Sequence, residues 1–517
     1  MDNDQKQSGE DIQNILLSQI LRENEDTEFG RVHGFRDIQN YEEYGSRVPL
    51  QDYEELRPYI ASIISGRENI LFPGSVYKFV TSSGSVANPK ILPLTKKFVN
   101  RSFKPFFKTY VSNLMREEPG LIANFNNVLN LKWDAGRRKP VLSSGDELSG
   151  LSQIDFSTDF SDTDMMEPGT NSPWSHVPSE IESDLDRLYA RLRLAAEHDI
   201  RYVIGINPRF IANAALLLDE RCETLFTDLE SGLVLGESHI GLQPNSALAD
   251  ELRARVSGTG TLRPRDVWPN IEGLVCWDGS IPELYLDRVR KWFGETTKIL
   301  PAPLALSEAN LAIPCDFQNN YQILCDDLTF FEFKRIGASE GPIFAGFETL
   351  VEGACYEIFV TTFSGLYRYR TGDVLRVHGF EGGVPLVRYV GRSNIETSHG
   401  IQEDILLECL KALDAQFNLG LSSAFFGTQS APSEGLDLYV ECVGVRDDED
   451  QIENWLNKIL TTALSEAGYP ISKRAVSVRF LSERTFYRDW KRQIDNGSRP
   501  PQVKDKILRD AAELSGL

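Results

Sequence analysis

The chain lacks the features that mark secreted and membrane proteins. Its seven cysteines are scattered and odd in number, with no C-x-x-C pair, so neither a disulfide framework nor a zinc ribbon is indicated. It contains no run of about 18 apolar residues that could cross a bilayer. Its first residues, MDNDQKQSGEDIQ, are acidic and polar, unlike a signal peptide. We expect a soluble, cytoplasmic protein.

Positive charge is also scarce. The chain has 54 lysines and arginines against 76 aspartates and glutamates, a formal net charge of −22. Because such a field repels polyanions, we expect neither nucleic acid nor membrane as a partner, and we expect a monomer. An anion such as ATP would need a local cationic site together with Mg²⁺.

The chain does contain enough apolar material for a large core. Of its 517 residues, 41% are hydrophobic and 25% are charged, which is typical of globular proteins. The length favours about three domains, or one large and one small. Strand-like and helix-like segments alternate along the middle of the chain, which predicts an α/β sheet covered by helices. The alternating segments are Leu185–His198, Arg201–Ile206, Pro208–Leu218, Gly273–Cys276, Ile281–Phe293 and Lys298–Leu300.

The second half of the chain carries two further patterns. Leu328–Phe333, Cys355–Thr362 and Leu366–Arg376 are typical of antiparallel strands joined by turns. Helix and strand patterns then alternate again, in Glu403–Asp414, Leu436–Val443, Asp450–Ala467 and Val476–Phe480. This last α+β unit of about 120 residues has the size of a compact domain. We therefore predict a boundary at Gly391–Asn394, between domains of residues 1–391 and 394–517.

One short stretch has a composition suited to phosphate. Tyr77–Val80 and Ile91–Leu94 are predicted to be buried strands, and the sequence between them is TSSGSVANPK. Hydroxyl and backbone N–H donors with a closing lysine can wrap phosphate oxygens and offset their charge. The stretch is not a Walker loop, because it has no G-x-x-x-x-G-K-[ST]. A Ser/Gly hairpin turn is the alternative explanation.

Two other segments stand out by composition. Ser143–Asp184 is acidic, rich in serine and aspartate and poor in periodic apolar residues, so we predict a surface excursion or a mobile flap and not core. Lys96–Leu114 carries five aromatic residues at near-helical spacing. This spacing favours an aromatic core face, and a wall of a ligand site is the alternative.

Several motifs in order resemble those of one known family. They are DTEFGRVHGF (Asp26–Phe35), VPLQDYEELRPYI (Val48–Ile60), TSSGSVANPK (Thr81–Lys90), Ser307–Glu308, FFEF (Phe330–Phe333), VTTFSGLYRYRTGDVLRVHGF (Val360–Phe380) and GRSN (Gly391–Asn394). The chain thus resembles the plant auxin-responsive acyl acid–amido synthetases (the Gretchen Hagen 3 family) of the adenylate-forming superfamily. The resemblance implies a large N-terminal α/β domain with mixed sheets and a β-barrel-like part, and a small C-terminal α+β domain.

The resemblance also implies a site for ATP and Mg²⁺. The residues it assigns to ATP are Ser82, Ser83, Gly84, Ser85 and Lys90 for the phosphates, Ser307 beside them, Phe330 or Phe331 as an aromatic flank, Asp373 for the ribose and Arg392 as a hinge arginine. Glu308 is the implied Mg²⁺ ligand, and one carboxylate suffices because Mg²⁺ keeps several waters. Taken singly, Ser307–Glu308 would be a helix cap and Gly372–Asp373 a turn.

Further residues complete the implied active site. The segment SRPPQVK resembles the family's late segment and makes Lys504 the expected catalytic lysine, with Lys506 as the alternative. Lys504 would stabilise the charge that builds during adenylation, together with Lys90 and Glu308. The hypothesised walls of the acyl-substrate pocket are Lys96–Leu114 with Phe106 and Phe107, Trp277–Tyr285, and Leu304, Ala305 and Leu306.

The implied reaction joins a small carboxylic acid to an amine, which we expect to be an amino acid. ATP would convert the acid to an acyl-AMP with release of pyrophosphate, and the amine would then displace AMP. The alternatives are an acyl-CoA ligase of the same superfamily and an inactive nucleotide-binding interaction protein. Because the two half-reactions need different groups around one nucleotide, we hypothesise that residues 394–517 rotate about Arg392–Ser393.

Overall fold

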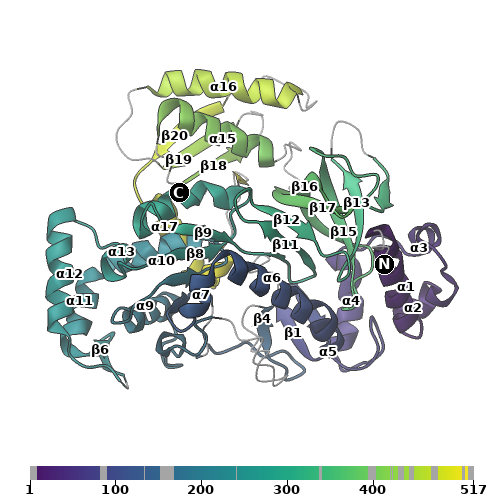
Figure 1. The fold of residues 1–517 in the computed structure, drawn as a ribbon, viewed down its shortest axis with the longest axis horizontal. Coiled ribbons are helices and arrows are strands. Elements are labelled where there is room, and N and C mark those ends of the chain that lie inside the picture. Colours follow the sequence, from purple (N-terminus) through teal and green to yellow (C-terminus); the bar gives the residue numbers. More distant parts are fainter. Residues whose placement is uncertain are drawn as a thin grey trace, which may run out of the picture.

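The protein has a wide N-terminal part and a smaller C-terminal part above it (Figure 1). The computed structural model describes residues 9–81, 90–132, 134, 136–151, 168–239, 241–336, 341–393, 403–419, 421, 423–428, 436–441, 448–466, 476–503 and 507–509. The N-terminal part contains three larger sheets, and the C-terminal part contains one. This arrangement agrees with the predicted α/β class and with a large domain followed by a small one.

A parallel sheet forms the centre of the N-terminal part. Its strands, in the order β3-β5-β8-β9, are β3 (Val128–Asn130), β5 (Tyr202–Ile204), β8 (Gly273–Cys276) and β9 (Lys298–Pro301). The strands are short and almost entirely buried because helices cover the sheet. The helices that connect or flank them are α9 (Asp184–Ala195), α10 (Pro208–Glu220), η6 (Ile281–Tyr285), α14 (Leu286–Phe293), α6 (Lys104–Glu117) and α7 (Pro119–Ala123). The predicted alternation of strands and helices is confirmed.

A helical extension projects from one side of this sheet, at the left of Figure 1. It consists of α11 (Cys222–Ser231), the β-ribbon β6 (Leu233–Val234) and β7 (Glu237–Ser238), α12 (Ser246–Thr259) and α13 (Pro264–Val267). Gly232 ends α11 with φ 70°, a conformation that glycine adopts without steric cost. The extension lies far from the sheets described next.

The second sheet has eight antiparallel strands in the order β10-β11-β12-β17-β16-β15-β13-β14. They are β10 (Leu304–Ala305), β11 (Asn310–Asp316), β12 (Tyr321–Leu324), β13 (Phe330–Arg335), β14 (Ile343–Ala345), β15 (Cys355–Thr361), β16 (Tyr369–Glu381) and β17 (Val384–Arg392). Register shifts interrupt the pairing of the two longest strands, β16 and β17, and such bulges bend a sheet. The expected barrel-like part corresponds to this sheet, which among the described residues is open between β10 and β14.

The third sheet carries the hydroxyl-rich segment. β1 (Lys78–Thr81) pairs antiparallel with β2 (Ile91–Leu94), and β4 (Leu148–Gly150) lies parallel to β1. The two predicted strands are confirmed. Thr81 pairs with Ile91, so the two ends of the segment that joins them lie next to each other. Residues 82–89, which include Ser82, Ser83, Gly84 and Ser85, lie outside the described residues.

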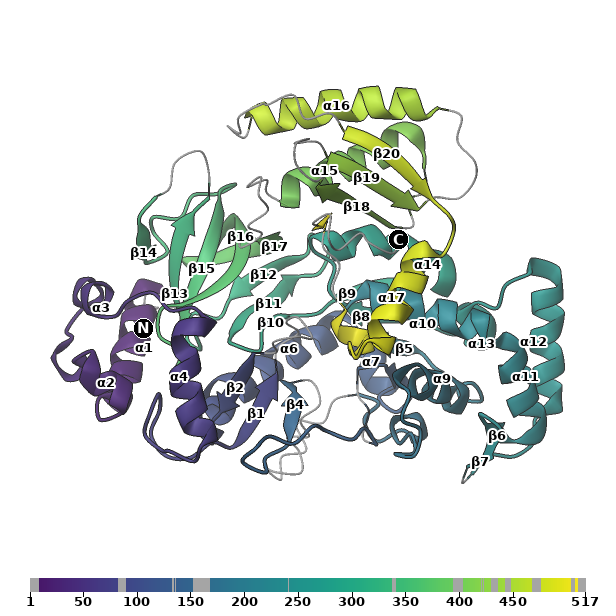
Figure 2. The ribbon, with the colours of Figure 1, turned by 180° about the vertical axis from the view of Figure 1, so that it is seen from behind.

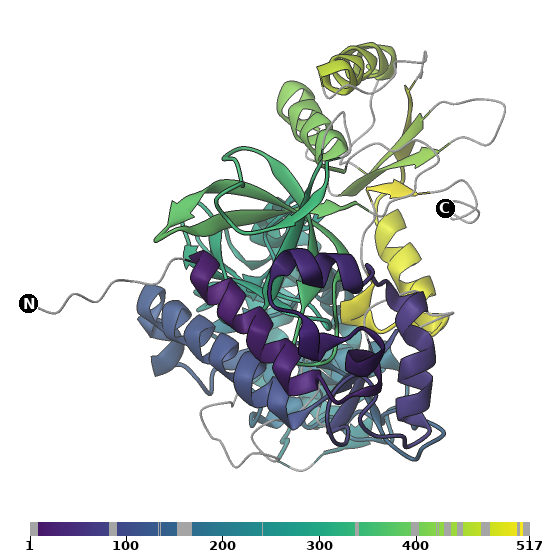
Figure 3. The ribbon, with the colours of Figure 1, turned by 90° about the vertical axis from the view of Figure 1, so that its right-hand side faces the viewer.

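Helices from the first third of the chain surround the second and third sheets. They are α1 (Gly9–Asn24), α2 (Glu28–Val32), η1 (Phe35–Asp37), α3 (Tyr41–Arg47), α4 (Tyr53–Ile64), α5 (Lys96–Phe98) and η2 (Val99–Phe103). Asp52 caps α4 through a capping box with Glu55, which fixes where this helix begins. The view from the side shows α1 and α4 against the sheets (Figure 3).

The acidic segment Ser143–Asp184 is only partly a surface excursion. Within it, β4 is buried, and η5 (Pro173–Ser175) places Trp174 in the core of the parallel sheet. The Trp174 indole N–H donates to the carbonyl oxygen of Val128 at 3.0 Å. The prediction of a segment without core contacts is therefore wrong for both ends. It failed because a few apolar side chains suffice for docking and make no periodic pattern. Residues 152–167 lie outside the described residues.

The C-terminal part is built on a four-stranded sheet in the order β20-β19-β18-β21. Its elements are α15 (Glu403–Phe417), β18 (Ser423–Thr428), β19 (Leu436–Glu441), α16 (Glu449–Glu466), β20 (Val476–Leu481) and β21 (Leu508–Arg509). They enclose a core to which Tyr285 of η6, in the N-terminal part, also contributes. The helices and strands predicted for this region are confirmed.

One helix of the C-terminal region packs elsewhere. α17 (Thr485–Asp495) lies beside the parallel sheet and its helices, as seen from behind in Figure 2. Its Tyr487, Trp490 and Ile494 belong to the core around that sheet, and so does Val503, which follows η7 (Pro500–Gln502). The chain therefore crosses back into the N-terminal part before β21 returns it to the small sheet.

Candidate active site

Glu308 lies in a tight turn between β10 and β11. The Leu306 N–H donates to the Ala309 carbonyl oxygen at 2.8 Å, which closes the turn. The turn is held in place because the buried Asn310 side chain donates to Ser102 Oγ at 2.9 Å. The Glu308 side chain is 12% exposed. Ser307 and Glu308 are thus held at a strand end and do not cap a helix.

Lys90 directly precedes β2, and its side chain reaches the turn that carries Glu308. Its Nζ lies 3.9 Å from Glu308 Oε1 and donates to the Tyr369 hydroxyl oxygen at 3.1 Å. The ring centroids of Tyr53 and Tyr369 lie 5.8 and 5.7 Å from the same ammonium. A cation and a carboxylate from segments more than 200 residues apart therefore meet at one place.

Asp373 and Arg392 form a second pair on the neighbouring strands β16 and β17. The two residues are register partners, and Arg392 Nε lies 3.5 Å from Asp373 Oδ1. The Arg392 guanidinium also donates to the Thr371 carbonyl oxygen at 2.7 Å. The Tyr389 hydroxyl donates to Asp373 Oδ1 at 3.3 Å. Gly372–Asp373 lies within β16, so it is not the turn that the dipeptide alone would favour.

The two pairs also act on one another electrostatically. The carboxylate of Asp373 raises the pKa of Arg392 most strongly, and the Glu308 carboxylate raises it further. Burial raises the pKa of Tyr369, and so does the Glu308 carboxylate, whereas the Arg392 cation lowers it. Lys90, Glu308, Tyr369, Asp373 and Arg392 lie near one another, because Lys90 contacts both Glu308 and Tyr369, Tyr369 and Asp373 share β16, and Arg392 pairs with Asp373. We name these five residues the charged cluster.

Three expected parts of the site are not among the residues of the charged cluster. Phe331 is fully buried, and its ring packs on Phe333 and Phe347 with centroids 6.2 and 6.5 Å away. It has no exposed face for a purine, so we leave it out of the site. Lys504 and Lys506 lie outside the described residues, between Val503 and Ile507, as do Ser82, Ser83, Gly84 and Ser85.

The expected acid-pocket residues divide into core and half-buried groups. Phe106 is fully buried and packs in a small core with Tyr110, so for this residue the core explanation holds. Phe107 is half-buried, 5.3 Å from the Phe106 ring, and borders the same core as Ala305. Leu304 and Leu306 are half-buried on either side of Ala305. Leu304, Ala305 and Leu306 directly precede Ser307 and Glu308 in the chain.

The acidic groups near the charged cluster suit Mg²⁺ better than a transition metal. Among the described residues, no three His, Cys, Asp or Glu side chains converge as a metal cage would require. A single carboxylate at Glu308 beside an expected polyphosphate matches Mg²⁺, which takes one or two protein ligands and completes its shell with phosphate oxygens and water.

Among the residues that the structure describes, no helix is long and apolar enough to cross a bilayer.

Asp278 lies within the expected pocket wall Trp277–Tyr285, but the sequence analysis did not single it out; it follows β8 at the carboxyl edge of the parallel sheet. Burial raises the pKa of this carboxyl to about 6, against a lowering by the Asn320 side chain and the Arg388 cation. The neighbouring Gly279 lies close to the backbone of Tyr389, since a Cβ on Gly279 would be 3.3 Å from the Tyr389 carbonyl oxygen. The position after a buried strand of a parallel sheet was the signal that could have found Asp278.

Replacing Asp278 by asparagine will stabilise the fold at neutral pH. The folded protein holds this proton more tightly than the unfolded chain, in which the aspartate has its ordinary pKa of 3.8. The carboxyl therefore costs no stability below about pH 4, and its cost grows as the pH rises until it is complete slightly above pH 6. We expect Asp278→Asn to raise the free energy of unfolding by about 1–2 kcal/mol at pH 7.5. Urea unfolding of both proteins across this pH range measures the difference.

The control for this measurement is Asp316→Asn. The Asn319 side chain lowers the pKa of the exposed Asp316 carboxyl, so the linkage has the opposite sign. The control should therefore lose stability at pH 7.5 and match the unchanged protein at low pH. A stability gain from Asp278→Asn that is the same at pH 4 and pH 7.5 would contradict the assignment of a raised pKa.

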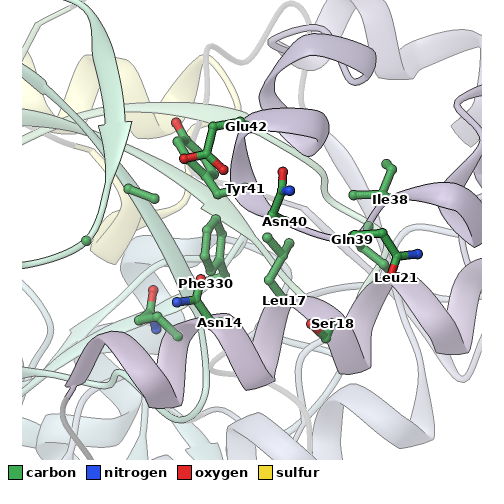
Figure 4. Close-up of a pocket in the computed structure, with 13 residues that line it drawn as sticks. Asn14, Leu17, Ser18, Leu21, Ile38, Gln39, Asn40, Tyr41, Glu42 and Phe330 are labelled. Carbon is green, nitrogen blue, oxygen red and sulfur yellow. The ribbon is translucent and has the colours of Figure 1, made fainter.

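A cavity of about 370 Å³ lies elsewhere, between α1, α3 and the edge of the eight-stranded sheet. Figure 4 shows Leu17 and Asn14 from α1, Tyr41 from α3 and Phe330 from β13 around it. Its lining mixes amide, hydroxyl and apolar groups and includes one carboxylate, Glu42. None of the five residues of the charged cluster lines this cavity.

Comparison with solved structures defines the class of fold. The chain superposes on the GH3.15 acyl acid amido synthetase with a TM-score of 0.78, covering 98% of this chain and 93% of that one at 20% identity. A second structure of that synthetase, in complex with 2,4-DB, matches with the same TM-score at 18% identity. The fold is therefore that of the acyl acid amido synthetases.

The sequence comparison defines the family. Residues 3–298 match the GH3 family N-terminal domain and residues 322–392 match the GH3 family central domain. The chain belongs to the GH3 family, which confirms the resemblance. It is 26% identical to the indole-3-acetic acid-amido synthetase GH3.17 of Arabidopsis thaliana, over 77% of this chain and 72% of that protein. It is also 26% identical to the jasmonoyl–L-amino acid synthetase JAR6 of Nicotiana attenuata, over 92% of this chain and 87% of that protein.

Proposed function

We propose that this protein is an ATP-dependent acyl acid–amido synthetase, which joins a small carboxylic acid to the amine of an amino acid. The observation that carries the proposal is the charged cluster, in which four segments of a GH3 chain converge. Lys90 and Glu308 supply a cation and a carboxylate, and Asp373 and Arg392 supply a second pair. Together they suit a nucleoside triphosphate, which needs acceptors for its ribose and charge for its phosphates.

The chemistry begins from a poor electrophile. A carboxylate does not react with an amine at neutral pH, because its leaving group would be oxide. In the first step a carboxylate oxygen attacks the α-phosphorus of ATP, and the bond from that phosphorus to pyrophosphate breaks. In the second step the amine nitrogen attacks the acyl carbon, loses a proton, and AMP leaves. Amide formation is thereby driven by the cleavage of ATP to AMP and pyrophosphate.

The residues of the charged cluster take complementary roles in the first step. Asp373, held by Tyr389 and Arg392, accepts hydrogen bonds from the two ribose hydroxyls. Lys90 offsets charge on the departing pyrophosphate, together with the hydroxyls of Ser82, Ser83 and Ser85. Glu308 would hold Mg²⁺, which would supply positive charge for the phosphate oxygens. We assign to Lys504 the role of stabilising the charge that develops at the α-phosphate, with Lys506 as the alternative.

The acid would enter beside the turn that carries Glu308. The half-buried Phe107, Leu304, Ala305 and Leu306 offer an apolar wall at that point. A substrate with an apolar body and a carboxylate directed at the charged cluster fits this arrangement.

The cysteines that the structure describes are free thiols, which suits a reducing compartment, and we propose the cytoplasm.

The two half-reactions also suggest two arrangements of the C-terminal part. The hinge segment is tied to that part because the Arg392 N–H donates to Glu403 Oε2 at 3.3 Å, at the start of α15. Gly391 permits this approach, since a Cβ there would lie 2.7 Å from the same oxygen. We propose that the sheet of β18 to β21, with α15 and α16, turns about residues 391–393 between the two steps.

Pyrophosphate exchange tests the proposed function. With ATP, Mg²⁺ and a panel of small carboxylic acids, we expect acid-dependent incorporation of labelled pyrophosphate into ATP by the purified chain. Adding amino acids should then yield the amide and AMP in equal amounts, measured by mass spectrometry. Asp373→Asn is the matched negative control, because it keeps the side-chain shape but removes the charge that accepts the ribose hydroxyls. Exchange that leads to a CoA thioester instead of an amide would contradict the proposal.

A further inference from the structure

Tyr369 places a buried phenol against the ammonium of Lys90. The residue is fully buried, although it opens a strand whose next residue, Arg370, is exposed. Its hydroxyl oxygen accepts a hydrogen bond from Lys90 Nζ at 3.1 Å, whereas the nearest Glu308 oxygen lies 3.9 Å from that nitrogen. The Tyr369 hydroxyl oxygen is thus closer to the Lys90 ammonium than the Glu308 carboxylate is.

The backbone on both sides of Tyr369 is fixed by one residue. The Gln51 N–H donates to the Arg368 carbonyl oxygen at 3.1 Å, and the Arg370 N–H donates to the Gln51 carbonyl oxygen at 2.8 Å. This ladder ties β16 to the entrance of α4. Because α4 also supplies Tyr53, the two rings beside Lys90 are held by the same contact. The phenol consequently has little freedom to move away from the ammonium.

The residue before Tyr369 is held in a strained conformation that reinforces this placement. Arg368 has φ 47°, which non-glycine residues rarely adopt. Its guanidinium donates to the fully buried Glu332 at 2.9 Å and to the carbonyl oxygens of Gly45 and Val48 at 2.6 and 2.8 Å. Strain held by so many contacts is typical of positions where a side chain must be presented in one direction.

The chemistry of lysine explains why such support is useful. The ammonium is a compact charge with three donors on a flexible stem, so without support it samples many positions. Burial and the Glu308 carboxylate raise the pKa of Tyr369, which keeps the phenol neutral and able to accept the hydrogen bond. One donor bound to the phenol leaves two for phosphate oxygens.

We propose that Tyr369 is a positioning residue for Lys90, holding the ammonium beside Glu308 where pyrophosphate charge develops. The effect of Tyr369 on catalysis rests on the proposed function. Its effect on the position of the Lys90 ammonium rests only on the contact between these two residues. Preorganised charge of this kind lowers the barrier because nothing has to be reoriented during the reaction.

A double-mutant cycle tests the proposal. Tyr369→Phe removes one oxygen and keeps the ring, and we expect it to lower the maximal rate of pyrophosphate exchange about 10- to 30-fold, the size of one hydrogen bond to a charged group. The KM for the carboxylic acid should stay unchanged. In a Lys90→Met background the same substitution should have no further effect, because the group that it positions is gone.

Tyr189→Phe is the matched control. Tyr189 is also fully buried, and its hydroxyl donates a 2.8 Å hydrogen bond to Asp228 Oδ2, in the core around the parallel sheet and not in the core that contains Tyr369. It should lose comparable stability and keep the full exchange rate. If Tyr369→Phe slows exchange equally with and without Lys90, or leaves it unchanged in the otherwise unaltered protein, the positioning role is overturned.

A second measurement does not depend on catalysis. Acetylation of Lys90 by limiting acetic anhydride, followed by peptide mass spectrometry, reports how firmly the ammonium is held. We expect Tyr369→Phe to raise the Lys90 labelling rate severalfold, while Tyr189→Phe leaves it unchanged. If no acid supports exchange, the proposed function fails and this comparison still decides the role of Tyr369. Equal labelling of the unaltered and Tyr369→Phe proteins would overturn it.

Discussion

Replacing Glu308 by glutamine will lower the rate of pyrophosphate exchange by about 100- to 1000-fold, the usual effect of removing one group that stabilises transition-state charge. The amide has the shape of the carboxylate but no charge, so it binds Mg²⁺ poorly. The Mg²⁺ concentration for half-maximal exchange should rise in the same variant. Stability should change by less than about 1 kcal/mol, because the Lys90 contact at 3.9 Å is a weak ion pair.

Glu272→Gln is the control that separates charge loss from a general effect. Glu272 also belongs to an ion pair, with Arg201 at 2.9 Å, but it precedes β8 at the opposite edge of the parallel sheet. The same chemical change there should leave both exchange and its Mg²⁺ dependence unaltered. An unimpaired Glu308→Gln protein would remove this carboxylate from the proposed mechanism, and an unfolded one would show that the turn needs the charge for structure.

Local pattern predicted the elements that are regular and buried. Gly273–Cys276 is an uninterrupted apolar run that follows Glu272, and the structure makes β8 from those four residues. The strands on either side of the hydroxyl-rich segment and the α+β pattern after Gly391 were predicted for the same reason. In each case the chain's own periodicity decides the structure, with no need to know its neighbours.

Such local patterns could not predict which residues meet in the folded protein. Nothing local in LTFFEF tells which ring faces a ligand, and Phe331 proves to be enclosed by other rings. The nearness of Glu308 to Arg392 arises from the pairing of strands far apart in sequence. The family resemblance, not periodicity, selected both residues. Tyr369 lay inside the recognised motif, but its contact with Lys90 becomes visible only when β16 is placed beside β2.

α17 illustrates the same limit for domain boundaries. Tyr487, Trp490 and Ile494 recur at helical spacing within a charged segment, so the helix itself could have been predicted. Which core that apolar face joins is not encoded in the spacing. The sequence interpretation assigned residues 394–517 to one mobile domain, whereas the face of α17 packs against the parallel sheet of the N-terminal part.

Replacing Trp490 by alanine will therefore destabilise the N-terminal part. Trp490 is fully buried, its ring lies 5.8 Å from that of Tyr487, and its indole N–H donates to the Pro500 carbonyl oxygen at 3.3 Å. Removing a buried tryptophan costs about 3–5 kcal/mol through lost packing and the cavity left behind. Hydrogen exchange followed by mass spectrometry should show faster exchange in α9, α10 and β8, with the free energy of unfolding reduced in urea.

Leu438→Ala is the comparison that locates the boundary. Leu438 is fully buried in β19, in the core that α15, α16 and the small sheet enclose with Tyr285, so its loss should accelerate exchange in α15, α16 and β20. α17 is also tied to the N-terminal part by the ion pairs Arg484–Asp219 and Lys491–Glu220, both at 2.6 Å. A rotation of the C-terminal part that leaves α17 in place must bend the chain near residue 482 and again after Val503, next to the expected catalytic lysine. Faster exchange confined to residues 403–481 in Trp490→Ala would instead show that α17 moves with the small sheet.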